Sequence, residues 1–374
     1  MALRSKAQAV LAAAALAAGL SAGAVVAAPQ ASAAVGSGIN QTGYEAAFTS
    51  TSGGLTGFNC TWPNGNALGG CNGANTGQSM AAGTSPSITT VNLTTYEMAF
   101  QSSTGALSIT GALGTGSLGL GMMPGTSPSI TALAEGGYEI AFEANTGVLW
   151  VAGNDGTGPI GTSMDPTSSP AIAPEINGGY EVAYQDSSHN LEIAGSLGTA
   201  NLGLPMTAGT NPSIMTPGTG GYEIAYDASN SALSVAGALQ SGPIGWNMWP
   251  GTSPDITYAP PTPNSPQGGF EIAFHYVDGR LFGFGSLLAG PVIDPRSPSG
   301  IQMAPGASPA LAGIIMPTFL GGGAAPSFEM FYEDTTGKLR YVIGSAFTTA
   351  YTNPAAWIGT IDPGTIPAVA SFAP

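Results

Sequence analysis

GYEIAF, residues 137–142, is one of seven copies of an aromatic–Glu hexapeptide that recurs along the chain. Within it the large apolar residues Tyr138, Ile140 and Phe142 alternate with Glu139 and Ala141, which is the period-two pattern of a β-strand. The aromatic residues of four successive copies lie 42 positions apart, and the other gaps are longer. The seven copies begin at Gly43, Thr95, Gly137, Gly179, Gly221, Gly269 and Ser327. The hexapeptide therefore predicts one strand in each unit of about 42 residues.

The other strands of the unit are indicated by residues at fixed distances from the hexapeptide. A leucine follows each aromatic residue eleven positions later, as Leu149 follows Tyr138, and turn residues such as those at 145–147 lie between them. These two strands form a hairpin. A second motif, GTSPSI at 125–130, predicts the first strand of a unit, because Pro is tolerated at a strand's first residue. Eight residues before its last apolar residue lies a Met, such as Met122, to which we assign a short fourth strand.

Four short antiparallel strands in a unit of this length are typical of a β-propeller blade. The abundance of Gly and Pro, 57 and 30 residues, and the lack of a helical period exclude helical repeats. The last copy of the first-strand motif, Pro367-Ala368-Val369, follows the seventh hexapeptide. The sequence therefore predicts an all-β, seven-bladed β-propeller with four antiparallel strands per blade. Its ring closes when the C-terminal strand at 367–370 joins the N-terminal blade beside Tyr44.

The N-terminal segment has the features of an export signal. Arg4 and Lys6 are followed by an apolar run over 10–28 and the small-residue tripeptide at 31–33. This pattern predicts a secretory signal peptide over residues 1–34 and a single propeller domain over residues 35–374. An uncleaved anchor is the alternative, because the run approaches membrane-spanning length. We expect a secreted, extracellular protein without direct membrane insertion after cleavage, and cell-surface association stays open.

The charge balance limits the partners of the mature chain. Once Arg4 and Lys6 leave with the signal peptide, four cationic side chains remain against 21 acidic ones, a net charge near −17. Such a field repels nucleic acid and anionic lipid surfaces. We therefore expect no nucleic acid among the partners.

Cys60 and Cys71 are the only cysteines of the chain. In an exported protein they predict one disulfide that closes a local loop, with free or metal-binding thiols as the alternative. The two histidines, His189 and His275, fall at unrelated positions of the repeat, so the sequence indicates neither a metal cluster nor a His-based triad. We expect no metal, no cofactor and no catalytic residues, although enzymatic activity is left undecided.

The Glu of the hexapeptide recurs in all seven units, at Glu139 and its equivalents. A carboxylate present once per blade favours a repeated structural contact over catalysis, and we expect it to accept hydrogen bonds from neighbouring backbone.

Irregular spacing indicates where a ligand binds. Insertions lengthen connections of the first, sixth and seventh units, between the first and second strands or between the third and fourth, so we expect them all on one face. Sugar binding requires an aromatic plate and a few polar groups. The candidate carbohydrate-binding residues are Trp62, Trp150, Asp294, Arg296 and Trp357.

The units GTSPSI, GYEIAF and TGVLWVAG (146–153), with the Met-x-Pro-Gly return at 122–125, resemble the propeller repeats of secreted actinobacterial proteins. More distantly, they resemble the fucose-binding propeller lectins of the Photorhabdus and Psathyrella type. The resemblance covers nearly the whole mature chain and implies sugar sites in clefts between adjacent blades. Among the seven residues that follow the third-strand Leu, only Trp150 offers an indole surface on which a sugar ring can pack. We therefore expect one or a few sites.

These observations predict a secreted, lectin-like propeller without catalytic activity, whose partner is a glycan or glycoconjugate. Two alternatives stay open. One is an extracellular glycan-active hydrolase or lyase with a site over the channel, and the other is a structural or adhesive surface protein. The sequence does not indicate the oligomeric state.

Overall fold

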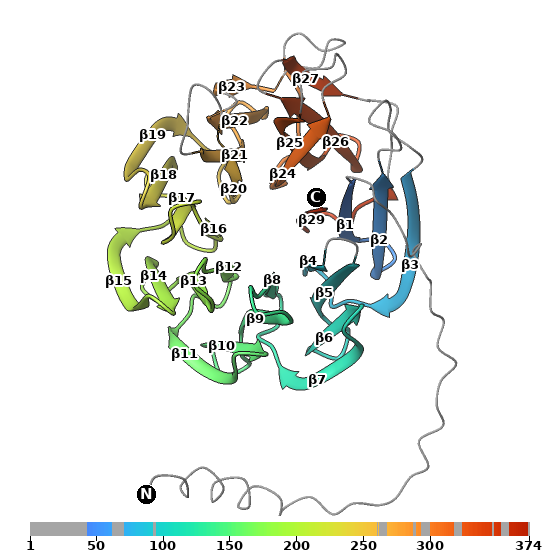
Figure 1. Cartoon of the computed structure of the whole chain (residues 1–374), viewed down its shortest axis with the longest axis vertical. Helices are drawn as coiled ribbons and strands as arrows, with labels where there is room; N and C mark the ends of the chain where they lie inside the picture. The colour runs from blue at the N-terminus through green and yellow to red at the C-terminus, as the bar shows by residue number, and fades with distance from the viewer. Residues whose placement is uncertain are drawn as a thin grey trace, which may run out of the picture. The chain divides into compact units, whose positions relative to one another are not determined.

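Seven antiparallel sheets surround a central channel in the computed structural model (Figure 1). The structure describes residues 43–61, 71–92, 95–259, 261, 268–286, 289–292, 300–317, 324–345, 348–352 and 359–372. Six sheets have four strands, and the seventh has a short additional segment paired with its third strand. The seven-bladed propeller with four antiparallel strands per blade is confirmed.

The strands of each blade follow one another outward from the channel. The innermost strands are β29 (Ala368–Phe372), β4 (Ser87–Asn92), β8 (Ser129–Ala132), β12 (Ala171–Pro174), β16 (Ser213–Met215), β20 (Asp255–Ala259) and β24 (Ala310–Pro317) in blades 1 to 7. The second strands, which contain the hexapeptide, are β1 (Gly43–Thr49), β5 (Thr95–Gln101), β9 (Tyr138–Glu143), β13 (Tyr180–Gln185), β17 (Glu223–Asp227), β21 (Gly269–His275) and β25 (Ala324–Glu333).

The two outer strands complete each blade. The third strands are β2 (Gly54–Thr61), β6 (Ala106–Gly111), β10 (Val148–Gly153), β14 (Asn190–Gly195), β18 (Ala232–Gly237), β22 (Leu281–Gly285) and β26 (Lys338–Ser345). The outermost strands are β3 (Cys71–Ser79), β7 (Thr115–Gly121), β11 (Thr157–Ser163), β15 (Gly198–Pro205), β19 (Gly242–Asn247), β23 (Ala289–Pro291) and β27 (Thr348–Thr352), with β28 (Gly359–Thr360) beside β26.

The C-terminal strand closes the ring as the sequence predicts. In blade 1, β29 pairs with β1, and Val369 lies opposite Ala46. Around the channel, a backbone N–H of six of the seven linkers donates to a side-chain oxygen of the next blade, for example from Ser85 to Ser127 Oγ at 2.8 Å. Six such bonds follow the series Ile366, Ser85, Ser127, Ser169, Asn211, Ser253 and Ser308. These bonds connect neighbouring blades independently of their apolar packing.

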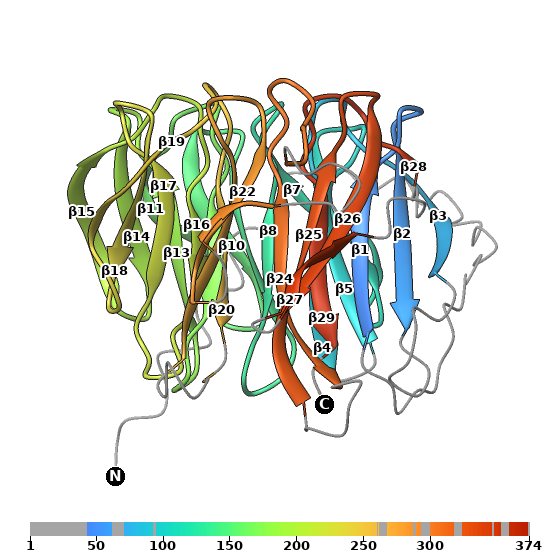
Figure 2. The ribbon, with the colours of Figure 1, turned by 90° about the horizontal axis from the view of Figure 1, so that it is seen from above.

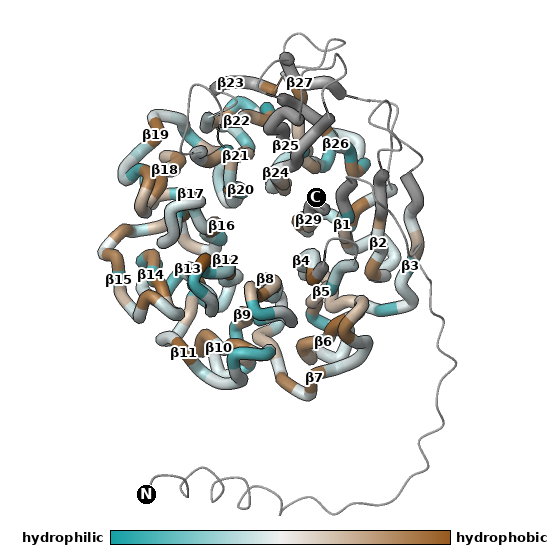
Figure 3. Tube along the Cα trace, in the orientation of Figure 1, coloured by the Kyte–Doolittle hydropathy of each residue, from teal (hydrophilic) through white to brown (hydrophobic). Residues whose placement is uncertain are grey.

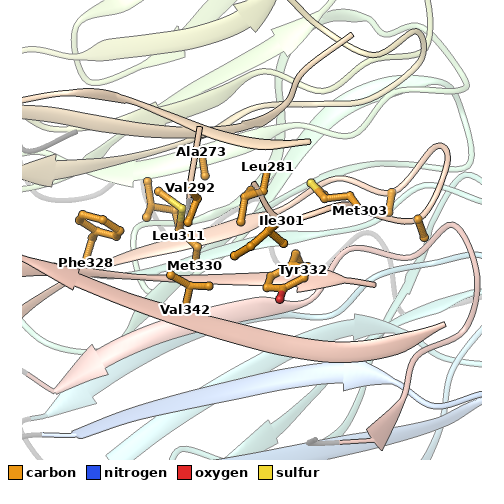
Figure 4. Packing of buried hydrophobic residues seen from close by; sticks show 12 residues of the cluster. Ala273, Leu281, Val292, Ile301, Met303, Leu311, Phe328, Met330, Tyr332 and Val342 are labelled. Carbon is orange, nitrogen blue, oxygen red and sulfur yellow. The ribbon is translucent and has the colours of Figure 1, made fainter. Parts of the chain in front are cut away.

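The hydrophobic core is divided among the junctions between blades. Figure 3 shows apolar residues recurring in the blades around the ring. Between blades 6 and 7, Leu281 and Ile301 pack with Leu311, Met330 and others in one buried cluster (Figure 4). The alternating apolar residues of each strand are thus buried where the sheet of one blade packs against the sheet of the next.

In blades 2 to 5 the Glu of the hexapeptide is a buried structural acceptor, as expected. Its carboxylate accepts a hydrogen bond from a backbone N–H of the turn between the third and fourth strands, as Glu97 Oε2 does from Leu113 at 2.7 Å and Glu139 Oε2 from Asp155 at 2.9 Å, and Glu181 and Glu223 do the same. The Glu97 and Glu139 carboxyl groups are fully buried, and desolvation raises their pKa values to about 7. The repeated acid therefore fixes a turn in its own blade.

The Met assigned to a short fourth strand lies elsewhere, so that assignment is wrong in detail. The outermost strand precedes the Met, which forms a β-bridge to the next blade: Met122 bridges to Ala144 and Met164 to Asp186. The Met is buried in both cases. It thus joins neighbouring blades, which explains its fixed distance from the following innermost strand.

The two faces of the ring carry different connections between strands (Figure 2). We call the face with the turns between second and third strands and with the interblade linkers the linker face. The opposite face, where β29 ends, is the insertion face, and residues 62–70, 260–268 and 318–323 are inserted there.

The expectation that every insertion lies on that face is wrong for one insertion in blade 6 and one in blade 7, because the described residues that flank each of them pair along the outer edge of the blade and not at its turn. Residues 293–299 fall after β23, between Val292 and Ile301, both of which bond to the backbone of Leu281. Residues 353–358 fall between Thr352 and Gly359, both paired with β26. In five other blades the outermost strand shifts register at the corresponding place. An edge strand with a bulge can accept an insertion without breaking a neighbouring pair.

Candidate functional site

The structure describes only one of the five predicted carbohydrate-binding residues. Trp150 lies in β10, half-buried, with its ring centroid 6.4 Å from that of Phe142, and it packs on the cluster between blades 2 and 3. The other candidates, Trp62, Asp294, Arg296 and Trp357, lie outside the described residues. Cys60 and Cys71 face each other across β2 and β3 in the backbone ladder.

A group of aromatic rings gathers between blades 5 and 6, and we call it the blade 5–6 site. Trp246 in β19 of blade 5 meets Tyr276 edge-on at 5.8 Å and Phe282 at 5.3 Å. Tyr276 stacks on Phe282 at 4.3 Å. Trp246 and Tyr276 are half-buried, whereas Phe282 is 3% exposed. The junction therefore leaves parts of the Trp246 and Tyr276 rings accessible to solvent above the buried Phe282 ring.

An ion pair borders these rings. The Arg280 guanidinium donates to Asp278 Oδ2, from Nε at 2.8 Å and from Nη2 at 2.5 Å. Its central carbon lies 5.2 Å from the centre of the Phe282 ring. Hydrogen bonding from Arg280 lowers the pKa of the Asp278 carboxyl, so the carboxylate stays ionised. A charged donor, Arg280, and a charged acceptor, Asp278, thus lie beside the aromatic rings.

Positions of the repeat explain how these side chains meet. Trp246 precedes the bridging Met248 by two residues, and Phe282 directly follows the third-strand Leu281. The equivalent of Trp246 in blade 2 is Leu120, and the equivalent of Phe282 in blade 5 is Ser234. The same backbone geometry therefore brings two side chains together at each junction, and aromatic residues occupy both positions here.

Trp249 extends the aromatic surface onto the linker face. Its indole is stacked on the His275 ring, with centroids 5.0 Å apart and planes at 12°. His275 is fully buried, its Nδ1 lies 2.9 Å from the Ala307 carbonyl oxygen, and desolvation lowers its pKa. A neutral imidazole that donates from Nδ1 fits this contact, and its role is structural support of Trp249.

The junction of blades 3 and 4 is polar and internally satisfied. Glu192 accepts from Tyr184, from Thr162 Oγ1 at 2.9 Å and from Asn201 Nδ2 at 3.0 Å. On the linker face, His189 Nδ1 lies 2.7 Å from Asp165 Oδ2. These contacts connect the two blades through side chains that already have partners.

The central channel holds a hollow of about 280 Å3 lined by the innermost strands. Asp255 is the one carboxylate among its described lining residues. It accepts from Ser213 Oγ at 2.6 Å and from the Leu311 N–H at 2.8 Å, and removal from water raises its pKa to about 6. Glycoside hydrolysis uses a pair of carboxyl groups, and the described lining does not supply a second one.

In the described part of the chain, no group of three or more His, Cys, Asp or Glu side chains is placed to hold a metal ion. The same part of the chain contains no helix long and apolar enough to cross a membrane.

The sequence carries only a weak signal for the blade 5–6 site. Trp246 and Trp249 stand out as rare residues, but Tyr276 and Arg280 occupy ordinary turn positions. Phe282 follows the third-strand Leu as Trp150 does, whereas Trp246 stands two residues before a Met, at a different position of the repeat. The two positions meet because the end of one outermost strand lies against the third strand of the next blade.

No protein-family model and no curated protein sequence matches the chain. Several solved lectin structures are similar. The BP39L lectin from Burkholderia pseudomallei aligns with a TM-score of 0.61 and 15% identity, over 84% of this chain and 95% of that chain. The fucose-specific lectin from Aleuria aurantia aligns with a TM-score of 0.48 and 12% identity, over 75% of this chain and 96% of that chain. At these identities the similarity shows the fold alone.

Proposed function

We propose that this protein is a secreted carbohydrate-binding propeller without catalytic activity and that the blade 5–6 site takes part in binding. The observation that carries the proposal is the contact of the half-buried Trp246 with Tyr276 and Phe282, bordered by the Arg280–Asp278 ion pair. The partner is a glycan or glycoconjugate.

The chemistry of the site matches what a pyranose offers. The apolar face of a sugar ring packs on an aromatic surface, and its hydroxyl groups need both donors and acceptors. Arg280 supplies donors and Asp278 an acceptor, and both side chains are partly exposed. Because the two charges neutralise each other at 2.5 Å, the site favours a neutral sugar over a charged one. The shared propeller fold of the BP39L lectin supports the proposal.

A second set of contacts is proposed on the residues that the sequence indicates. Trp62, Trp150, Asp294, Arg296 and Trp357 supply three indoles, a carboxylate and a guanidinium. Trp150 is half-buried and has part of its ring available at the junction of blades 2 and 3. The blade 5–6 site does not depend on these residues.

A glycan array probed with the mature chain, followed by calorimetric titration of the strongest neutral saccharides, tests the function. We expect saturable binding of one or more neutral glycans. Absence of binding to every neutral saccharide at millimolar concentration contradicts carbohydrate recognition, and release of reducing ends from a bound glycan contradicts the non-catalytic role.

A further inference from the structure

A second hollow, of about 370 Å3, lies at the mouth of the channel on the insertion face. The ends of the innermost strands of four consecutive blades form its walls. They contribute Ala132, Leu133 and Ala134 from blade 3, Pro174, Glu175 and Ile176 from blade 4, Thr216, Pro217 and Gly218 from blade 5, and Tyr258 from blade 6. None of these residues belongs to the blade 5–6 site.

The walls of this hollow are largely apolar. Leu133 is 5% exposed, whereas the Ile176 side chain is 51% exposed although it is large and hydrophobic. Tyr258 reaches from blade 6 over the turn of blade 5: its hydroxyl oxygen lies 2.6 Å from the place where a Cβ of residue 218 would be. Glycine at position 218 therefore leaves room for the phenol. Concave apolar surfaces of this size with few polar groups are typical of small-molecule sites.

Carboxyl groups border the apolar walls. Glu175 is 6% exposed, and its Oε1 has no hydrogen-bond partner. Glu135 directly follows the wall residue Ala134 and shares a hydrogen bond with Asp155, a contact between two acidic side chains. No Lys or Arg occurs between residues 7 and 279, so blades 1 to 5 supply no cation to these groups.

We propose that this hollow binds a small organic ammonium ion, with its alkyl or aryl part against Leu133, Ile176 and Pro217 and its cationic group beside Glu175 and Glu135. A buried carboxylate oxygen without a partner is costly, and a ligand ammonium supplies the missing donor. The Tyr258 ring offers a further surface that attracts a cation. The carboxyl groups of Glu135, Asp155 and Glu175 repel an anionic ligand of the same shape.

Calorimetric titration of the mature protein with octylammonium, whose primary ammonium group has N–H donors, and with octyl sulfate, both below their micelle concentrations, tests this site. The two probes share an alkyl chain and differ in the sign of the charge. We expect saturable binding of the ammonium probe and at least tenfold weaker binding of the sulfate, since tenfold corresponds to about 1.4 kcal/mol, the order of one charged hydrogen bond. Equal affinity for the two probes overturns the proposal, and so does no binding of the ammonium probe at millimolar concentration.

Variants locate the binding. Ala134→Trp places a large ring at the exposed edge of the hollow and should abolish binding. The double change Glu135→Gln and Glu175→Gln should weaken it about tenfold. Leu113→Ser removes an exposed leucine (48% exposed) from the same face outside the hollow, and Asp362→Asn removes an acid from the linker face; both should leave the affinity unchanged. Binding that survives Ala134→Trp, or that Leu113→Ser removes, contradicts the site, and if Ala134→Trp does not fold, an unchanged affinity of the double variant contradicts it.

Discussion

The Ile366 N–H donates to Ser85 Oγ at 2.7 Å, across 281 positions of sequence. Ile366 precedes the strand that completes blade 1, and Ser85 precedes the innermost strand of blade 2. The bond therefore continues the series around the channel across the place where the two ends of the chain meet. The series lacks one member, from Ser308 to residue 366, because an isoleucine side chain has no acceptor.

Ser85→Ala should destabilise the propeller by about 1–2 kcal/mol, because it leaves the Ile366 N–H without its acceptor. Equilibrium unfolding in guanidinium measures the change. Ser103→Ala, at an exposed turn of the linker face, is the matched control and should leave the unfolding midpoint in place. Equal midpoints for the two variants would show that the ring of bonds does not contribute to closure.

The protein should be more stable in mild acid than at alkaline pH. Burial raises the pKa values of Glu97, Glu139 and Glu181 from 4.5 to about 7. Between pH 4.5 and about pH 7 the folded state therefore binds more protons than the unfolded chain. The free energy of unfolding falls as the pH rises through this range. Calorimetry should show a Tm several degrees higher at pH 5 than at pH 8. Glu139→Gln should reduce this dependence, and a Tm that rises from pH 5 to pH 8 contradicts the account.

Cys60 and Cys71 should form a disulfide in the exported protein. Directly opposed residues of antiparallel strands have Cα atoms about 4.5–5.5 Å apart, which is within the range that a disulfide spans. The intact mass without reductant should be lower by two hydrogens than after reduction. We expect the Cys60→Ser and Cys71→Ser double variant to lose about 2–3 kcal/mol of stability. Detection of two free thiols in the exported protein by alkylation would refute the pairing.

Gly153→Ala should destabilise blade 3 by several kcal/mol. A Cβ at residue 153 would lie 2.2 Å from the Tyr138 carbonyl oxygen and 2.6 Å from Glu139 Oε2, so the turn that the buried Glu fixes cannot keep its geometry. Gly114→Ala is the matched control, because its Cβ would meet only the end of the Ile109 side chain at 3.5 Å. Equal Tm values for the two variants would contradict the close contact.

The sequence predicts the fold in detail because each blade repeats the same local rules. The aromatic–Glu hexapeptide, the Leu eleven positions later and the Pro-small-apolar motif fix three strands and the closure at Val369. The fourth strand was misplaced because its residues vary, whereas the conspicuous Met122 and its equivalents bridge to the next blade. The side-chain hydrogen bonds of the channel were not foreseen, since they depend on the stagger between blades.

The site was harder to predict because it is made by residues from two blades. Trp150 follows the third-strand Leu of blade 3, and Phe282 occupies the same position in blade 6. What completes a site there is the partner from the preceding blade: Trp246 in blade 5, but Leu120 in blade 2. A periodic sequence reveals equivalent positions, whereas the contact between different positions of neighbouring blades requires the three-dimensional structure.

The central claim is that the blade 5–6 site binds carbohydrate, and titration of the strongest neutral glycan against two matched variants tests it most directly. Trp246→Ala removes the half-buried plate of that site, and Trp150→Ala removes an indole of similar burial at the junction of blades 2 and 3. We expect Trp246→Ala to weaken binding at least tenfold, as loss of an aromatic contact of about 1.4 kcal/mol requires, while the calorimetric stoichiometry falls by one site. Unchanged affinity and stoichiometry in a folded Trp246→Ala variant would contradict the claim, and loss of binding in Trp150→Ala alone would place the sugar at the other junction.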